Sequence, residues 1–361
     1  MSNYQIDDMV QGVKNFIEAT GIHDGDKVLF LADTRSDQAS LQACALGLKM
    51  IGAKPIVFTM DRLARYSRVP DEAIGAAAHT DVIVLTWPVF ITAGLNAVRN
   101  ARTPTSDFDP STAVPGQPKL VYFECAPGIL ASSYAQFPNE LLWAIAKRIK
   151  EIALKGKKIR VTCPRGTDLV STYDSSKLFA MQTRPVEPGG RCHFPWGRCG
   201  IFHGAGEANG VVYLDTAQGV DGVFEEPMRW VVEKNVIVEC EGGEIAQHMK
   251  KLERQYKQPI HFCEIMFGFH PHVPQKVGLD DYMHWAFNSK WAWFGIRVGE
   301  GLANARGQHL DGPCFWSSVY IDDQLVMERG RLTLCDDPEI REIASKYGDP
   351  DDLLEHITHA Q

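Results

Sequence analysis

Hydrophobic positions in the first part of the chain alternate between short continuous runs and amphipathic stretches. Continuous apolar runs occur at 26–33, 54–60, 81–90 and 119–125, and such runs are typical of strands that are buried on both faces of a parallel sheet. Residues 36–53 and 139–157 have helical spacing, and Gly52 is expected to end the first of these helices. A further strand is expected at 157–164. This alternation predicts an open, parallel α/β domain over residues 1–164.

The N-terminal stretch that precedes these runs is predicted to be an amphipathic helix. Its apolar residues recur at helical spacing; they are Ile6, Met9, Val10, Val13, Phe16 and Ile17.

The pattern changes after residue 164. Short β-like runs appear at 210–215, 229–242 and 315–323, glycine and aromatic residues become frequent, and one clear helical pattern remains at 242–257. A polar helix is expected at DPEIREIASKYG near the C-terminus. Residues 165–361 are therefore predicted to form a second, β-rich α+β domain that ends in a helix.

Composition narrows the class of protein. The chain has 361 residues, 45% of them hydrophobic and 23% charged, with a formal net charge of −8, which is ordinary for a globular protein and gives no basic field for nucleic acid. No signal peptide and no membrane-spanning run are recognisable. The nine cysteines are scattered without a CxxC pair, which favours reduced, buried thiols in a cytoplasmic protein.

The strongest chemical signal is the pair His309 and Asp311, at the head of an apolar, β-rich run. On a strand, residues i and i+2 face the same side, so the imidazole and the carboxylate would point at one place. Mononuclear iron sites are built from two histidines and one carboxylate in this manner. By itself an HxD pair is a common sequence, and a structural role for it stays open.

Glu264 adds weight to a metal site. It stands within the apolar run of IHFCEIMFGFHPHVPQ, where His261, His270 and His272 also lie, and a carboxylate in such a run requires a partner. Either it binds a metal ion, or it forms a buried salt bridge with an arginine such as Arg297. Glu264, His309 and Asp311 together would hold one ion and leave coordination positions open, as catalytic metal sites do.

Two further features have both a chemical and a structural interpretation. His193, in GGRCHFPWGRCG, is either a general acid or base or a loop histidine packed on Trp196. Trp291 and Trp293 lie in the aromatic cluster HWAFNSKWAWFGIR. They are expected to be part of the core, although the same residues would suit the wall of a pocket for a flat ring.

These motifs resemble, in the same order, those of the group that joins M29 metallo-aminopeptidases to 2,5-dihydroxypyridine 5,6-dioxygenases. The stretches HLD…VYIDD, EIMFGFHP and GRCHFPWG followed by NGVVYLD carry the resemblance. It implies metal ligands at His309 and Asp311, a third ligand in EIMFGFHP and a catalytic histidine at His193. Glu264 stands where the dioxygenase branch has histidine and the aminopeptidase branch has glutamate. Residues 293–301 offer Arg297 but neither the histidine nor the tyrosine of a second metal site.

Three functions follow as hypotheses. The first is a mononuclear Fe(II) dioxygenase that cleaves a hydroxylated aromatic or N-heterocyclic ring, with O2 as co-substrate, Trp293 lining the pocket, Arg297 binding an anionic group and His193 moving a proton. The second is a metal-dependent hydrolase, an aminopeptidase or a small-ring amidase, with Zn, Co or Mn. The third is a non-enzymatic protein whose HxD pair is structural. By analogy with these relatives, a homo-oligomer is expected.

Overall fold

The computed structural model describes residues 5–61, 69–86, 98, 101–102, 115–175, 178–179, 182–202, 206–217, 223–273, 291–298 and 309–355. These residues divide into two compact units. The first unit is formed by the chain up to Glu140 together with Gln182–Trp196, and the second by Leu141–Met181 and most of the chain after Trp196. The chain therefore returns to the first unit after it has begun the second, and the predicted boundary at residue 164 falls within the second unit.

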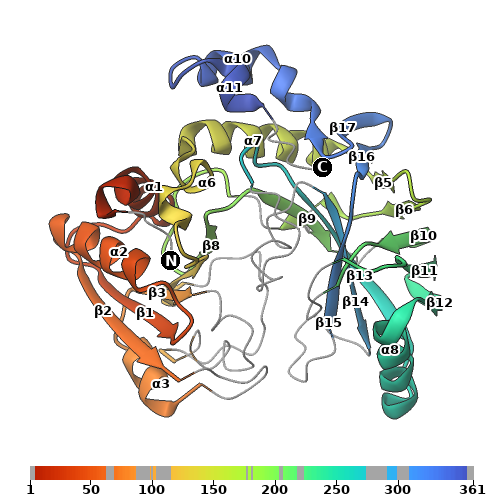
Figure 1. Cartoon of the computed structure of the whole chain (residues 1–361), viewed down its shortest axis with the longest axis horizontal. Coiled ribbons are helices and arrows are strands. Elements are labelled where there is room, and N and C mark those ends of the chain that lie inside the picture. The colour runs from red at the N-terminus through yellow and green to blue at the C-terminus, as the bar shows by residue number, and fades with distance from the viewer. Residues whose placement is uncertain are drawn as a thin grey trace. The chain divides into compact units, whose positions relative to one another are not determined.

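The first unit is a parallel sheet with helices, as the hydrophobic pattern predicts (Figure 1). Its elements are η1 (Ile6–Met9), α1 (Val10–Thr20), β1 (Lys27–Asp33), α2 (Gln38–Met50), β2 (Lys54–Met60), α3 (Asp71–Ala77), β3 (Val82–Thr86), β4 (Lys119–Phe123), η2 (Ile129–Ala131), α6 (Ser133–Gln136) and β8 (Arg191–Phe194). The strand order is β2-β1-β3-β4-β8, and every neighbouring pair is parallel.

Helix α1 covers one face of this sheet, and the ring of Phe16 contacts three of its strands. The ring of Phe16 lies 6.3 Å from that of Phe30 on β1, 5.3 Å from Phe123 on β4 and 5.4 Å from Phe194 on β8. The predicted amphipathic helix is confirmed, with Met9, Val13 and Phe16 buried. Ile6 and Val10, which share its predicted apolar face, are about half exposed.

The opposite face of the sheet is covered by small residues of α3. Ala73 and Ala77 pack in one buried cluster with Leu29, Leu31, Ile83, Leu85, Leu120 and Tyr122. Burial on both faces explains why β1, β3 and β4 are almost uniformly apolar.

A buried amide attaches α6 to α1. The Nδ2 atom of Asn15 donates to the main-chain oxygens of Ala135, at 3.0 Å, and Phe137, at 2.8 Å. Both hydrogen bonds are buried, so this side chain supplies donors to acceptors in the interior.

The second unit is built around an antiparallel sheet. Its elements are α7 (Asn139–Lys155), β5 (Lys158–Thr162), β6 (Asp168–Thr172), β7 (Leu178–Phe179), β9 (Arg198–Phe202), β10 (Ala208–Leu214), β11 (Met228–Glu233), β12 (Val236–Glu241), α8 (Gly243–Tyr256), β13 (Ile260–Gly268), β14 (Ala292–Val298), β15 (His309–Cys314), β16 (Ser318–Ile321), β17 (Gln324–Glu328), β18 (Arg331–Leu332), η4 (Thr333–Asp336), α10 (Pro338–Ala344) and α11 (Pro350–Leu354). The main strand order is β15-β14-β13-β12-β11-β10-β6-β5-β16-β17-β18, and β9 pairs with β13 and β7. The β-rich second domain and its C-terminal helix α10 are thus confirmed.

One strand belongs to a different sheet from the one predicted. Residues 157–164 were expected to continue the parallel sheet, but β5 is antiparallel to β6 and β16. Its side chains alternate between exposed and buried, which is the pattern of an antiparallel strand with one solvated face. The fifth place in the parallel sheet is taken instead by β8.

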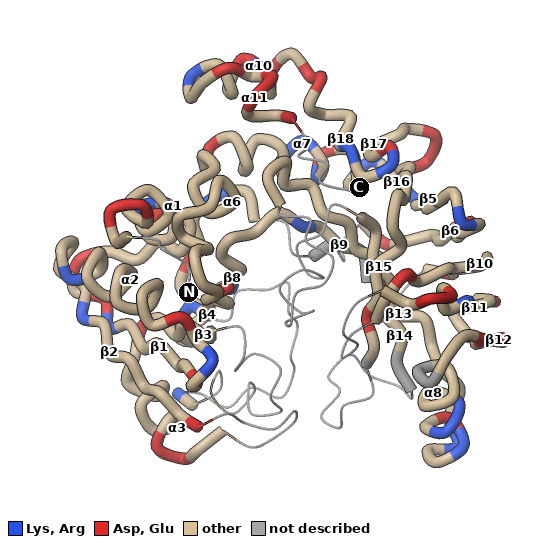
Figure 2. Tube along the Cα trace, in the orientation of Figure 1, with Lys and Arg blue, Asp and Glu red and all other residues tan. Residues whose placement is uncertain are grey.

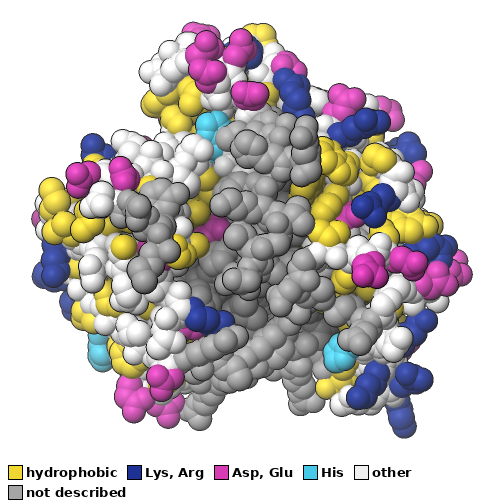
Figure 3. All heavy atoms as spheres, viewed as in Figure 1, with side chains coloured by type: hydrophobic (Ala, Val, Ile, Leu, Met, Phe, Trp, Pro, Cys, Tyr) yellow, Lys and Arg dark blue, Asp and Glu magenta, His cyan; other side chains and the backbone are white. Residues whose placement is uncertain are grey.

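Charged residues of both signs are interspersed along the described chain (Figure 2). On the face shown in Figure 3, lysine, arginine and acidic side chains alternate over the described surface without forming one broad basic area. None of the described helices combines the length and apolar character needed to cross a bilayer.

Candidate metal centre

Three neighbouring strands of the second unit bring Glu264 and Asp311 together. Strands β13, β14 and β15 are antiparallel, and their register places Glu264 opposite Gly295 and Gly295 opposite Asp311. Residues directly opposite one another share a face of the sheet. Both carboxylates are buried, with 6% of Glu264 and 4% of Asp311 exposed. The sequence prediction that Glu264 is a buried carboxylate is therefore correct.

Gly295 leaves the space into which both carboxylates reach. A Cβ atom at this position would lie 2.8 Å from Oδ1 of Asp311 and 2.9 Å from Oε1 of Glu264, with Cγ of Glu264 at 2.6 Å. Distances below 3.0 Å are essentially never seen for a real Cβ atom. The two oxygens thus converge on one point above the glycine, where any side chain would exclude them.

A β-bulge directs Glu264 to this face. The register between β13 and β14 shifts between Phe262, which pairs with Ile296, and Glu264, which pairs with Gly295. Phe262 consequently faces the apolar side, where its ring lies 6.0 Å from that of Phe294, and Glu264 faces the other side. Without the extra residue, positions 262 and 264 would share a face. Bulges are common beside active sites because they redirect a side chain in this way.

The two carboxylates fit a bound cation. Two buried anions that converge on one point repel each other unless a proton or a cation lies between them. Carboxylate oxygens are hard ligands that suit Fe(II), Mn(II) and similar divalent ions. This donor set therefore accepts a metal ion, and the space above Gly295 is where its oxygens meet.

His309 occupies the expected place in the register. It begins β15 two residues before Asp311 and pairs with Arg297 on β14, so the strand puts positions 309 and 311 on one face. The side chains of His309 and Arg297 lie outside the described part of the structure. Among the described side chains, no group of three or more His, Cys, Asp and Glu residues is arranged to hold a metal, and the complete ligand set stays a prediction.

The alternative salt bridge between Glu264 and Arg297 is not a directly opposed pair. Arg297 lies opposite His261 on β13. Arg198, which the sequence analysis did not single out, is a second cation of this face. It pairs with Gly268 on β13, four residues along the strand from Glu264, which pairs with Phe202. Arg198 is only 8% exposed. The signal available in the sequence was the spacing of Arg198, Gly200 and Phe202. On a strand, this i, i+2, i+4 spacing places all three residues on one face.

The two tryptophans are buried, as expected. Trp293 lies two residues before Gly295 on β14, opposite Met266 and Pro313, and therefore belongs to the same face as the carboxylates. Trp291 precedes the strand and packs against Phe315, with ring centroids 4.3 Å apart and the rings tilted by 31°.

His193 lies in the first unit, on β8. Its ring is 4.6 Å from that of Tyr122, which is its partner on β4. It is therefore a strand residue beside a tyrosine and not a loop histidine, while Glu264 and Asp311 belong to the second unit. Among the histidines near Glu264 in the sequence, His270 is fully buried, and its Nδ1 accepts a hydrogen bond from the main-chain N–H of His272 at 3.0 Å.

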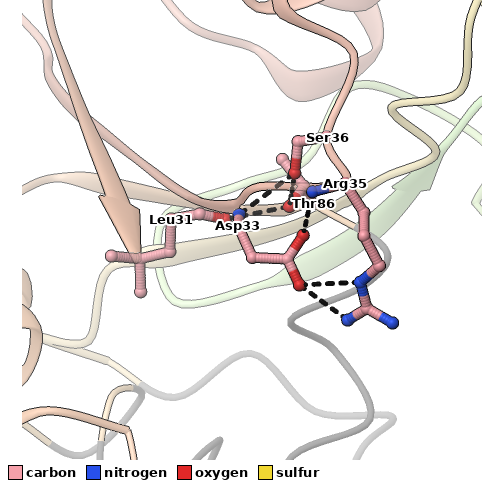
Figure 4. Close-up of polar contacts among 5 residues, drawn as sticks. All are labelled: Leu31, Asp33, Arg35, Ser36 and Thr86. Atoms are coloured by element: carbon pink, nitrogen blue, oxygen red, sulfur yellow. Dashed lines mark hydrogen bonds and ion pairs between the residues drawn. The ribbon is translucent and has the colours of Figure 1, made fainter. Parts of the chain in front are cut away.

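The first unit has its own polar cluster at the point where the strand order reverses between β1 and β3 (Figure 4). Asp33 accepts hydrogen bonds from Nε of Arg35 at 3.0 Å and Nη2 at 2.6 Å, and Ser36 is hydrogen-bonded to Thr86 at 2.8 Å. Ligands often bind at such a reversal in open α/β sheets. Here Arg35 is paired with Asp33 and the two hydroxyls are hydrogen-bonded to each other, so the cluster fixes the ends of β1 and β3.

Comparison with known proteins gives a consistent picture. The family model described as NicX, 2,5-dihydroxypyridine 5,6-dioxygenase, matches residues 128–272. The 2,5-dihydroxypyridine dioxygenase of Pseudomonas putida KT2440 is similar in structure, with a TM-score of 0.62 and 17% identity over 94% of this chain and 99% of that chain. Wild-type AmpT from Thermus thermophilus, an M29 aminopeptidase, has a TM-score of 0.56 and 14% identity over 91% of this chain and 100% of that chain. No curated protein matches by sequence.

These comparisons confirm the resemblance and the fold. Both branches that the motifs pointed to, the dioxygenases and the M29 aminopeptidases, are found. The family match includes β8, with His193, and β13, with Glu264, whereas β15 lies beyond it.

Proposed function

We propose that this chain is a metal-dependent dioxygenase that cleaves the ring of a hydroxylated N-heterocyclic or aromatic compound such as a dihydroxypyridine. The observation that carries the proposal is the meeting of the Glu264 and Asp311 carboxylates above Gly295. The strand that bears Glu264 lies within the part of the chain that matches the dioxygenase family.

Glu264, Asp311 and His309 are the proposed ligands, and Fe(II) is the proposed ion. When bound, such an ion supplies a site at which O2 and the deprotonated hydroxyl of a substrate react. Glu264 and Asp311 would neutralise the charge of such an ion, which lowers the cost of burying it.

The remaining predicted residues act on the substrate. His193 accepts the proton of the substrate hydroxyl. Trp293 offers an apolar surface to the ring, and Arg297 pairs with a carboxylate or oxyanion of the substrate. Assembly into a homo-oligomer and a cytoplasmic location remain predictions that accompany this function.

A metal-dependent hydrolase is the second candidate, and Glu264 is the observation that favours it. Glutamate at this position resembles the aminopeptidase branch, and the fold is also that of AmpT. In this case the same ligands would hold Zn, Co or Mn, and the ion would activate water for attack on an amide.

The test is to reconstitute the protein without oxygen, separately with Fe(II), Mn(II), Co(II) and Zn(II), and to measure two reactions. Oxygen uptake with a panel of dihydroxypyridines and dihydroxybenzoates that depends on Fe(II) supports the dioxygenase. Release of the chromophore from aminoacyl anilides with Zn(II) or Co(II), without oxygen uptake, supports the hydrolase. Absence of stoichiometric binding of any of the four metals would refute both.

Two variants separate metal binding from turnover. His309→Ala is expected to lose the metal, measured by elemental analysis after dialysis. His193→Ala is expected to retain the metal and lose turnover. The exposed His79 in a His79→Ala variant is the matched control, because it removes a histidine of the same unit outside the proposed site.

A further inference from the structure

A pair of thiols in the second unit lies outside the proposed metal centre. All nine cysteines are among the described residues, and none of them forms a disulfide; eight are buried, and Cys163 is half-buried. Cys163 follows β5 directly, and Cys314 is the last residue of β15. Although they are far apart in the sequence, both cysteines contact Thr167, and each thiol influences the pKa of the other.

Thr167 holds both cysteines in place. The main-chain N–H of Cys163 donates to the carbonyl of Thr167 at 3.1 Å, which closes the tight turn between β5 and β6. The Sγ atom of Cys314 lies 3.3 Å from Oγ1 of Thr167, and the main-chain N–H of Tyr213 donates to the same hydroxyl at 2.8 Å. Thr167 therefore connects the main chain of Cys163 to the Cys314 sulfur and to β10.

The two thiols differ in accessibility. Cys163 is partly exposed, whereas Cys314 is fully buried. A reagent in solution can therefore reach Cys163 first. The buried Cys314 thiol can then react with the oxidised side chain of Cys163.

The pKa values of the two thiols are shifted in opposite directions. The hydrogen bond from Cys314 is the largest effect on the pKa of Cys163, and with further bonds from Thr167 and Arg165 it lowers that pKa to about 5. Burial acts in the opposite direction on Cys314 and raises its pKa. Asp215, which accepts a bond from Phe315 and pairs with Arg165 at 2.9 Å, is the nearby anion. At neutral pH, Cys163 is the reactive thiolate.

We infer that Cys163 and Cys314 form a peroxide-reactive thiol pair, in which Cys163 is oxidised first and Cys314 resolves it into a disulfide. In the first step the Cys163 thiolate attacks hydrogen peroxide, the O–O bond breaks, and Cys163 becomes a sulfenic acid as hydroxide leaves. In the second step the Cys314 sulfur attacks the sulfenic sulfur, an S–S bond forms, and water is released. Peroxide is reduced by two electrons, which come from the two thiols.

A metal site is not the better interpretation of these residues. Cys163, Cys314 and Asp215 lie near one another, yet no group of three or more potential ligands is arranged to hold an ion among the described side chains. A dithiol that joins distant segments, with one accessible and one enclosed sulfur, is the arrangement of reversible redox pairs in reducing compartments.

Peptide mapping of the wild-type protein tests the inference. Reduced protein is treated with a few equivalents of hydrogen peroxide at pH 7, alkylated and digested with trypsin without reductant. Cleavage places Cys163 alone on residues 161–165 and Cys314 alone on residues 307–329. The expected product is these two peptides joined, lighter by two hydrogen atoms than their sum and separated again by dithiothreitol. A reduced Cys163 after treatment, or a disulfide to any other cysteine, would overturn the inference.

Two variants and a labelling profile complete the test. In Cys314→Ala, peroxide should convert Cys163 to a sulfenic acid that dimedone traps, without a disulfide. Cys192→Ala removes a buried thiol of the first unit and should leave the cross-link unchanged. Iodoacetamide should label Cys163 at pH 6 at least tenfold faster than any other cysteine of the folded wild-type protein; equal labelling rates would contradict the assignment.

Discussion

Replacing Gly295 with alanine tests whether the two carboxylates form a metal centre. The added Cβ atom would meet Cγ of Glu264 at 2.6 Å, Oδ1 of Asp311 at 2.8 Å and Oε1 of Glu264 at 2.9 Å. Ordinary contact begins at 3.4 Å, so these atoms must move by about 0.5–0.8 Å. Metal–ligand distances tolerate only about 0.2 Å, and the displacement is several times larger.

The expected result is a loss of metal affinity that exceeds the loss of stability. Disturbing even the groups that support a ligand lowers affinity by about 10- to 100-fold, and Gly295→Ala should reach at least this range. Overpacking should also lower the free energy of unfolding by about 1–3 kcal/mol. Both are measured on metal-free protein, by anaerobic titration calorimetry with Mn(II) and by urea denaturation.

Gly312→Ala is the matched control for this change. Gly312 lies next to Asp311 on β15, and a Cβ there would meet Leu214 and the main chain of Thr216, each at 2.6 Å. The variant should lose comparable stability and keep its metal affinity. If Gly295→Ala binds Mn(II) as tightly as the wild type, the carboxylates above Gly295 are not the ligands, and the proposed centre is wrong.

Three more outcomes are expected. Asp311→Asn should abolish the rise in melting temperature that added metal gives, because a carboxylate ligand is replaced by a neutral amide; a retained metal-induced rise would contradict this. Asn15→Ala should lower the free energy of unfolding by about 2–4 kcal/mol in urea titrations, since two buried carbonyls lose their donor; a change below about 0.5 kcal/mol would show that water replaces the amide. The hydrogen bond from Arg160 lowers the pKa of Asp168 below its ordinary value of 3.8, so this exposed pair contributes stability above that pH and loses it as the pH falls through the folded-state value. Arg160→Ala should therefore cost less than about 1 kcal/mol at pH 7 and nothing near pH 2, measured by thermal unfolding across pH.

The parallel sheet was predictable because its strands carry a local signal. Strands β1, β3 and β4 are buried on both faces, and such strands are recognisable as continuous apolar runs. The edge strand β8 has no such run, because its four residues alternate between half-buried and buried positions. Its place beside β4 depends on a pairing between residues far apart in the sequence, which periodicity does not report.

The candidate site was predictable in its residues but not in its construction. An acidic residue in an apolar run identified Glu264, and i,i+2 spacing identified the face that positions 309 and 311 share. The contact between Glu264 and Asp311 depends on the bulge before Glu264 and on the missing side chain of Gly295. Neither is visible in hydrophobic patterning, because a bulge shifts the alternation by one residue and a single glycine in a strand has several explanations.

The return of the chain to β8 has a consequence for synthesis on the ribosome. When β4 has left the exit tunnel, its outer edge has no partner until residues 191–194 follow, and the chain between them includes α7 and the hairpin of β5 and β6. The first sheet therefore cannot be completed from a nascent chain that stops at Glu140, where the first unit breaks off. During translation the unpaired edge of β4 is a place where a chaperone or another unfinished chain can bind. A chain translated from a truncated messenger RNA that lacks β8 would keep this edge unpaired.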